Sequence, residues 1–232
     1  MSIDQNVARI RERIASAAHR TRRNPDEITL MAVSKTHPPE LIREAYGAGL
    51  RVFGENRVQE LSGKAAALAD LKDAKWHLIG HLQTNKAARA AELFSAIDSV
   101  DSLKVADKLN SSAQSLSKRL EVLIEINGGG EAAKSGLTPN SPELEYLLNA
   151  APRLEHLDFR GLMTIPPFVE NPEDARPYFR QLRKLRDSIA SRKMPSVGTG
   201  VLSMGMSHDF EIAIEEGSTC VRVGTAIFGE RG

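Results

Sequence analysis

The feature of this sequence that most constrains its fold is a regular alternation of two kinds of segment. Short apolar runs rich in β-branched residues occur at 28–33, 51–53, 76–80, 96–100, 121–126, 159–165, 197–203 and 219–223. Segments with apolar residues three and four positions apart lie between most of them, at 39–48, 57–70, 85–93, 102–118, 141–150, 173–193 and 208–216. The first pattern is typical of buried strands and the second of amphipathic helices. The alternation therefore predicts parallel strands connected by helices.

Eight strands connected in this way favour a closed α/β barrel, a (β/α)₈ or TIM barrel, with a doubly wound open sheet as the alternative. The 232 residues provide enough chain for one such domain, and we expect a single domain over residues 1–232. One extra helix precedes the first strand, because Ile3, Val7, Ile10 and Ile14 fall on one helical face. A transit peptide is the alternative for this Arg-rich segment, but acidic residues interrupt its basic run.

Composition narrows the class of protein. The chain is 41% hydrophobic and 26% charged, as is ordinary for a globular protein, and its net charge of +1 indicates neither nucleic acid nor a membrane as a partner. No apolar run is long enough to span a bilayer. Cys220 is the single cysteine, so no internal disulfide can form, and we interpret it as a buried structural thiol. These features together favour a cytoplasmic protein.

The residues that follow the strands are the candidates for function, because the active sites of parallel barrels lie at the carboxyl ends of their strands. The residues at or beside those ends are Ser34, Lys35, Thr36, His37, Gly54, Glu55, Asn56, Arg57, His77, His81, Gln83, Thr84, Asn85, Lys86, Asn127, Lys134, Ser135, Met163, Thr164, Ser203, Met204, Gly205, Met206, Ser207, Arg222, Gly224 and Thr225. No HExxH, Cys-x-x-Cys or GxSxG pattern is present, so we expect no metal site and no serine-hydrolase nucleophile.

A lysine and several glycine-rich turns stand out in this set. The turn "GTAIFG", with "SMGMS" as a second wall, can bind a phosphate at a helix start, although both are also compatible with simple tight turns. Lys35 ends the run "LMAVSK", and a lysine whose pKa is lowered from about 10.4 can form a Schiff base with an aldehyde. Pyridoxal 5′-phosphate is an aldehyde that carries a phosphate, and Arg222 could face its pyridine nitrogen. A solvated charge at the strand end is the alternative for Lys35.

The motifs "LMAVSKTHP", "FGENRVQE", "WHLIGHLQTNK", "KSGL", "GLMTI" and "LSMGMSHDFEIAIEEGSTCVRVGTAIFG" together resemble the pyridoxal phosphate homeostasis protein family, which is related to the barrel domain of alanine racemase. The resemblance runs from about residue 28 to the last few residues. It implies a pyridoxal phosphate-binding barrel without the second β-domain of the racemases, since the chain ends directly after "GTAIFGERG".

The resemblance also implies roles for individual residues. Lys35 looks like the lysine that holds pyridoxal 5′-phosphate as a covalent aldimine, and Arg222 like the residue that faces the pyridine nitrogen. Ser203, Gly205, Gly224 and Thr225 look like phosphate contacts; Asn56, His77 and Met163 look like walls of the cofactor pocket, and Met204 could touch the ring. Lys134 is a hypothetical accessory site for the aldehyde.

The function that the resemblance implies is to bind and buffer pyridoxal phosphate without catalysis, in vitamin B6 and amino-acid balance. Pyridoxal phosphate-dependent apoenzymes are possible recipients, and we expect a monomer. One alternative is a racemase or decarboxylase that uses His37, His77 or His81 as a base. The tyrosines, Tyr46, Tyr146 and Tyr178, all fall in helix-like segments away from strand ends. A second alternative is an interaction protein that has lost cofactor binding.

Overall fold

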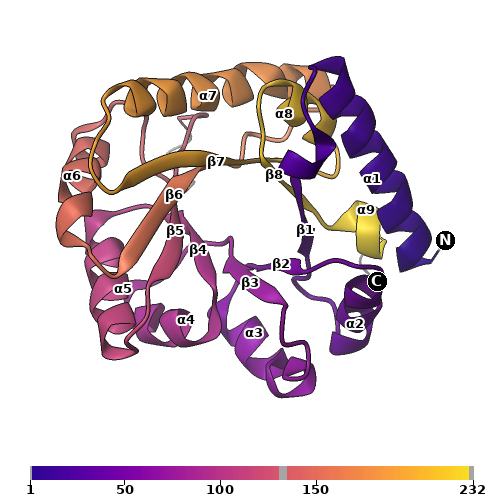
Figure 1. The fold of residues 1–232 in the computed structure, drawn as a ribbon, viewed down its shortest axis with the longest axis horizontal. Helices are drawn as coiled ribbons and strands as arrows, with labels where there is room; N and C mark the ends of the chain where they lie inside the picture. The colour runs from indigo at the N-terminus through magenta and orange to yellow at the C-terminus, as the bar shows by residue number, and fades with distance from the viewer. Residues whose placement is uncertain (1, 131–134, 230–232) are drawn as a thin grey trace.

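The computed structural model describes residues 2–130 and 135–229, which form a closed barrel of eight parallel strands surrounded by helices (Figure 1). The strands are β1 (Thr29–Val33), β2 (Val52–Glu55), β3 (Lys75–Leu78), β4 (Ala96–Val100), β5 (Leu120–Glu125), β6 (Leu157–Met163), β7 (Val197–Met206) and β8 (Cys220–Val223). Each strand pairs with the next in the chain, and β8 closes the barrel against β1. The predicted (β/α)₈ barrel is confirmed, and the open sheet is wrong.

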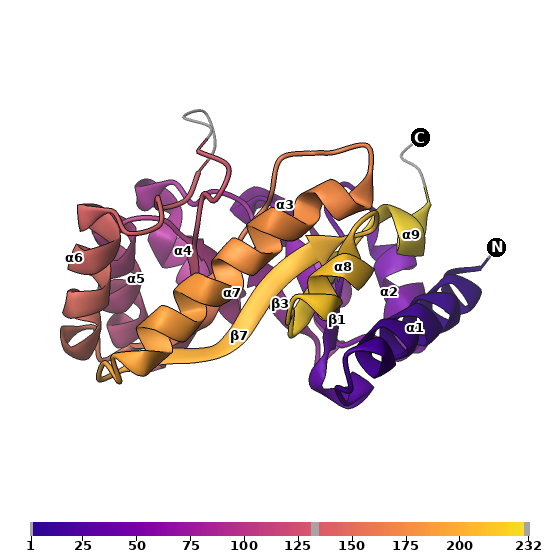
Figure 2. The same ribbon diagram turned by 90° about the horizontal axis from the view of Figure 1, so that it is seen from above.

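The helices lie outside the strands and connect them (Figures 1 and 2). They are α1 (Ile3–Arg20), α2 (Pro39–Gly47), α3 (Val58–Lys64), α4 (Ala87–Leu93), α5 (Leu103–Ser115), α6 (Pro142–Ala150), α7 (Arg176–Ser191), α8 (Phe210–Glu215) and α9 (Thr225–Phe228). Prolines at the starts of α2 and α6 occupy positions where a missing N–H costs no helical hydrogen bond. Among the helices found in the described ranges, none is long and apolar enough to cross a membrane.

Helix α1 is the extra element before the barrel. Its first turn is closed by a capping box, in which the Ser2 hydroxyl accepts from the Gln5 backbone N–H and the Gln5 side chain accepts from the Ser2 N–H. The predicted apolar face is buried, and α1 contacts α2, α8 and α9. It therefore covers the outside of the barrel beside the seam between β8 and β1, as Figure 1 shows.

The core has an outer and an inner part. Most buried apolar side chains fill the space between the strands and the helices, in two large clusters. Inside the barrel, a smaller cluster consists of Met31, Val33, Ile79 and Cys220, with Val52 and Val201 packed against it. We call these six residues the interior layer. The sulfur of Cys220 is buried, and burial raises the pKa of its thiol to about 12, as fits the structural thiol that we expect.

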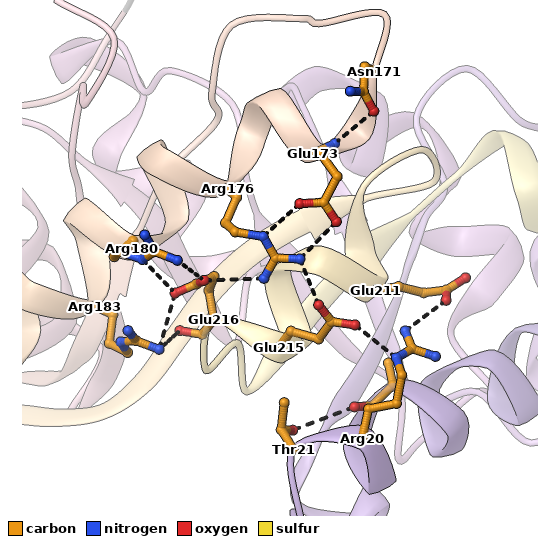
Figure 3. A network of polar contacts seen from close by, with 11 residues as sticks. Arg20, Thr21, Asn171, Glu173, Arg176, Arg180, Arg183, Glu211, Glu215 and Glu216 are labelled. Carbon is orange, nitrogen blue, oxygen red and sulfur yellow. Dashed lines mark hydrogen bonds and ion pairs between the residues drawn. The ribbon is translucent and has the colours of Figure 1, made fainter.

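Helix α8 is held by an ion-pair network that joins it to α1 and α7 (Figure 3). Glu215 lies between two arginines, at 2.8 Å from Arg20 and 2.7 Å from Arg176. The buried Glu216 accepts from three arginines, namely Arg176, Arg180 and Arg183. Since α8 connects β7 to β8, this network fixes the short helix between two strands that carry candidate site residues.

Candidate active site at the carboxyl ends of the strands

A cavity of about 500 Å³ lies at the carboxyl ends of the strands, within the size range of small-molecule sites. Its lining comes from the ends of β1, β2, β3, β5, β6, β7 and β8 and from the segments that follow them: Val33, Lys35, His37, Asn56, Ile79, Gly80, His81, Glu125, Ile126, Ser135, Ile165, Phe168, Met206, Ser207, His208, Arg222, Gly224, Thr225 and Gly229. We call it the carboxyl-end cavity. Five of the ten predicted site residues border it: Lys35, Asn56, Arg222, Gly224 and Thr225.

Lys35 is presented by a tight turn directly after β1. The backbone N–H of His37 donates to the Ser34 carbonyl at 3.2 Å, and Thr36 adopts a left-handed backbone with φ of 66°. Such a conformation is costly for a β-branched residue, so the surrounding contacts must hold it. Lys35 itself is half-buried on the cavity wall.

Those contacts come from a buried cluster beneath the turn. The Ser34 hydroxyl donates to Glu55 at 2.7 Å, and the Lys64 ammonium donates to both Glu55 (2.9 Å) and the Ser34 carbonyl (3.0 Å). Burial raises the pKa of Glu55, while the Ser34 hydroxyl and Lys64 act to lower it. The cluster therefore anchors Ser34, the residue next to Lys35, to β2 and α3, and it fixes the backbone that presents the lysine.

Arg222 lies in the barrel interior on β8 and is only 2% exposed. Its guanidinium donates to the Ser203 hydroxyl at 2.8 Å and to the Thr164 carbonyl at 2.7 Å. Burial lowers the pKa of Arg222, but the group stays protonated because the ordinary pKa of arginine is far above neutrality. Arginine carries five N–H donors, so donors remain for a ligand in the cavity that Arg222 borders.

A wall of small residues lies across the end of β8. Helix α9 begins at Thr225 with Gly224 as its cap, and the Ser207 hydroxyl accepts from the N–H groups of Gly224 (3.3 Å) and Ala226 (3.4 Å). The turn that carries Ser207, residues 206–209 after β7, is held by Asp209, whose carboxylate accepts from the Met206 N–H at 2.6 Å. Backbone amides thus converge on an oxygen at the cavity edge, which is the kind of arrangement that binds phosphate oxygens.

The prediction placed the "SMGMS" turn three residues too early. Strand β7 runs to Met206, not to residue 203, so Ser203, Met204 and Gly205 lie within the strand and none of them borders the cavity. Ser203 holds Arg222, and Met204 packs in the outer core. Gly205, with φ of 95°, lets β7 approach α8, because a Cβ there would lie 2.5 Å from the Cβ of Ala213. Ser207, which is among the strand-end candidates but not among the ten residues to which the resemblance gives a role, lies at the cavity edge.

Two further predicted wall residues lie elsewhere. Met163 is fully buried at the end of β6 and does not border the carboxyl-end cavity. His77 lies within β3 and faces a different cavity, at the amino ends of the strands, where its Nδ1 lies 2.9 Å from Asp98. His77 therefore does not border the cavity that Lys35 borders, whereas His81, four residues further on, does. Lys134 lies outside the described residues.

Glu125 is the most notable residue that the prediction missed. It ends β5, borders the cavity and is almost fully buried, and its Oε2 has no hydrogen-bond partner among the described residues. Burial raises the pKa of this carboxyl to about 7, with Asp101 adding to the rise and Arg222 and His81 opposing it. The signal was present in the sequence, since a glutamate inside the apolar run "VLIEI" is unusual for a buried strand.

Comparison with known proteins finds a family model and relatives that match nearly the whole chain. The family model described as alanine racemase, N-terminal domain, matches residues 5–232. The pyridoxal phosphate homeostasis protein of Aquifex aeolicus is 48% identical over 231 residues, covering 100% of this chain and 99% of the relative. That of Pseudomonas aeruginosa is 44% identical over 230 residues, covering 99% of this chain and 96% of the relative.

The structural comparison agrees. The structure of PipY from Synechococcus elongatus with pyridoxal phosphate bound superposes with a TM-score of 0.86 at 38% identity, covering 98% of this chain and 100% of PipY. An alanine racemase of Clostridium difficile matches in fold, with a TM-score of 0.71 at 16% identity, and this chain covers 57% of it. The chain belongs to the alanine racemase N-terminal domain family and, within it, to the pyridoxal phosphate homeostasis proteins. The resemblance inferred from the sequence is confirmed.

Proposed function

We propose that this protein binds pyridoxal 5′-phosphate as a Schiff base on Lys35 and serves vitamin B6 and amino-acid homeostasis as a non-catalytic carrier or buffer. The observation that carries the proposal is the convergence of Lys35, Arg222 and the Ser207–Thr225 wall on one cavity. The names of the curated relatives, and the pyridoxal phosphate bound in PipY, support the same ligand.

The residues present fit this cofactor. A cavity of about 500 Å³ accommodates a small phosphorylated pyridine ring. Lys35 would provide the amine, Ser207 and the start of α9 at Gly224 and Thr225 would hold the phosphate, and Arg222 would lie at the ring nitrogen. The orphaned Oε2 of Glu125 gives the cavity one further polar group that a ligand can satisfy.

Arg222 also supports the non-catalytic part of the proposal. When bound, pyridoxal phosphate supplies an electron sink whose strength depends on protonation of its ring nitrogen. Arg222 is a permanent cation fixed by Ser203 and Thr164, so it disfavours a proton at a neighbouring nitrogen. The three tyrosines lie on α2, α6 and α7, and none of them borders the described cavity.

A racemase-like enzyme is the second candidate, and Glu125 is the observation that favours it. A buried carboxyl with a pKa of about 7 is suited to acid–base chemistry, and His81 borders the same cavity. The two candidates differ in turnover. A carrier does not exchange the α-proton of alanine for solvent deuterium, whereas a racemase does so at a rate proportional to enzyme concentration.

The first experiment tests Lys35. We expect purified protein incubated with pyridoxal phosphate to show a visible absorption band that borohydride removes, with the pyridoxyl group then located on Lys35 by peptide mass spectrometry. Lys35→Ala should lack the band, while the variant Lys72→Ala, at an exposed lysine away from the cavity, should retain it. A band that persists in Lys35→Ala, or a wild type that binds no pyridoxal phosphate, would refute the assignment.

Delivery to other proteins is the remaining part of the proposal. We propose that the protein acts as a monomer and that pyridoxal phosphate-dependent apoenzymes are its recipients. Mixing the loaded protein with an apo-aminotransferase should restore aminotransferase activity faster than spontaneous release into a trap of free pyridoxal phosphate allows. Equal rates would limit the function to buffering.

A further inference from the structure

A second cavity, of about 550 Å³, lies at the opposite end of the barrel, among the amino-terminal parts of the strands. Its lining includes the pair His77 and Asp98 and the apolar residues Ala96, Leu123 and Val201. We call it the amino-end cavity. The interior layer separates it from the carboxyl-end cavity, because Val33 and Ile79 border one and Val52, Val201 and Cys220 border the other.

Asp98 on β4 is the notable polar group of this cavity. Its side chain is 1% exposed, and its Oδ1 lies 2.9 Å from the Nδ1 of His77. Its Oδ2 is shielded from solvent and has no hydrogen-bond partner among the described residues. Leaving a buried carboxylate oxygen unsatisfied costs stability, and native structures contain few such atoms. A ligand that donates a hydrogen bond there would recover this cost.

The remaining lining defines the chemistry of such a ligand. Apolar side chains, including those of Ala96, Leu123 and Val201, form much of the wall, so the body of the ligand should be short and apolar. Within the part of the chain that the structure describes, no group of three or more His, Cys, Asp or Glu could hold a metal ion. Since a metal ion is not indicated, we expect an ammonium group, which can donate a hydrogen bond to Asp98 and also compensate the charge of a buried carboxylate.

We propose that the amino-end cavity binds a small primary ammonium compound with a short apolar body, whose N–H groups donate to Asp98. The same chemistry is presented by a simple alkylamine and by a zwitterionic amino acid. The exposed cations Lys75 and Arg160 border the cavity and could pair with the carboxylate of an amino acid, while the exposed carboxylates Glu27 and Glu121 border it too and favour the ammonium end of either ligand. This inference does not depend on pyridoxal phosphate binding at Lys35.

His77 competes with the ligand for the charge of Asp98. Burial lowers the pKa of His77, but the charge and hydrogen bond of Asp98 outweigh burial and raise it overall, with Glu121 adding to the rise and Lys75 opposing it. A protonated His77 already compensates Asp98, so the ligand binds best when His77 is neutral. The titration is therefore performed at several pH values up to about 9, where an alkylamine is still protonated, and binding should strengthen as His77 loses its proton.

The test follows the His77 ring and the Ala96 amide by NMR while n-propylammonium is added to the full chain. We expect a saturable shift of both signals, no saturable shift with the neutral isostere 1-propanol, and the same shift in Lys35→Ala. L-alanine distinguishes the two sources of the ligand. Tighter binding of L-alanine than of n-propylammonium, lost in Lys75→Ala or Arg160→Ala, would identify an amino-acid site, and the reverse order an alkylamine site.

Two variants and one matched control complete the test. Asp98→Asn removes the charge with little change of shape and should abolish the shift. Ala96→Leu fills the wall while leaving the His77–Asp98 pair in place, and it should also abolish binding. Asp101→Asn makes the same change at the other end of β4, next to His81, and should bind normally. No saturable shift in the wild type, or an unchanged shift in Asp98→Asn, would overturn the proposal.

Discussion

The two ends of the barrel carry the same pair of side chains in different surroundings. At the carboxyl end, the Nδ1 of His81 lies 2.8 Å from Asp101, and the His81 side chain is 54% exposed. At the amino end, the Nδ1 of His77 lies 2.9 Å from Asp98, and the two side chains are 17% and 1% exposed. His77 and Asp98 lie on β3 and β4 themselves, whereas His81 and Asp101 lie in the segments that follow these two strands. Burial, and not distance, is what distinguishes them, so the same hydrogen bond should matter far more at the amino end.

The two cavities differ in a similar way. The carboxyl-end cavity is built largely from turns and a helix start, which expose backbone amides and place Lys35 and Ser207 at its edge. The amino-end cavity is built largely from strand residues, so its polar groups are side chains that alternate with apolar ones. A barrel therefore offers ready phosphate-binding geometry only at its carboxyl end, and a site at the other end must rely on a few buried charges.

The largest expected effect on stability comes from a substitution in the interior layer, which separates the two cavities. Met31 is fully buried at the centre of the interior layer, and Met31→Ala should lower the free energy of unfolding by about 3 kcal/mol, since truncating a buried side chain leaves a cavity. Urea unfolding followed by the fluorescence of Trp76, the single tryptophan, measures this. The partly exposed Leu116→Ala is the control and should cost less than about 1 kcal/mol. Equal losses in the two variants would show that the layer is not a structural barrier.

Glu125 should give the second largest effect, through the pH dependence of stability. Its pKa is raised from the ordinary value to about 7, so the folded protein holds this proton more tightly than the unfolded chain. The stability it contributes is therefore complete below about pH 4.5 and is lost as the pH rises to about 7. Glu125→Gln should remove about 2 kcal/mol of that decline between pH 4.5 and 7.5, as measured by urea unfolding at several pH values. An unchanged decline would mean that another group titrates.

Much of this architecture can be predicted from the sequence. The strands of a parallel barrel are buried on both faces, so they are apolar runs that contrast sharply with the amphipathic helices between them. Lys35, Asn56, Gly224 and Thr225 can be placed at the cavity because each lies just beyond an apolar run. Arg222 is predictable for a different reason, since an arginine inside an apolar run demands a buried partner.

The rest of the site depends on details that composition does not specify. The end of β7 is misjudged because "SMGM" contains a glycine and looks like a turn, although Gly205 serves close packing against α8. His77 lies in the apolar run 76–80, and His81 directly follows it. Which end of the barrel each histidine faces depends on where the strand ends and on the alternation of side chains along it. A shift of one residue along a strand reverses the direction of a side chain, so such assignments require the register.

The ion-pair network of α8 predicts a smaller effect. Glu216 is buried among Arg176, Arg180 and Arg183, and although burial raises its pKa, the arginine hydrogen bonds lower it overall. Glu216→Gln should cost about 1.5 kcal/mol of unfolding free energy at pH 7, because it weakens several charge-assisted hydrogen bonds. Helix α8 connects the turn at Ser207 to the strand of Cys220, so this loss should loosen both cavities.

An exposed ion pair provides the matched control for Glu216. Arg89 and Glu92 are both about half exposed on the surface, and Glu92→Gln should cost no more than about 0.5 kcal/mol. Urea unfolding of both variants at low and high salt completes the comparison, since salt screens the exposed pair and leaves the buried one nearly unaffected. A Glu216→Gln variant as stable as Glu92→Gln would mean that the network does not fix α8.

The smallest expected effect on stability is a pH dependence that compares the two histidine–aspartate pairs directly. The pKa of His77 is raised, so the stability that its protonation contributes is complete below about pH 6.5 and is lost as the pH rises through the folded-state value. His77→Asn should remove this decline above pH 6.5, in a window that begins near where that of Glu125 ends. His81→Gln should alter the same part of the curve less, because the His81 side chain is 54% exposed to solvent. If the two variants instead alter the curve equally, burial is not what distinguishes the ends of the barrel, and the charge of Asp98 would have to be compensated by something other than His77.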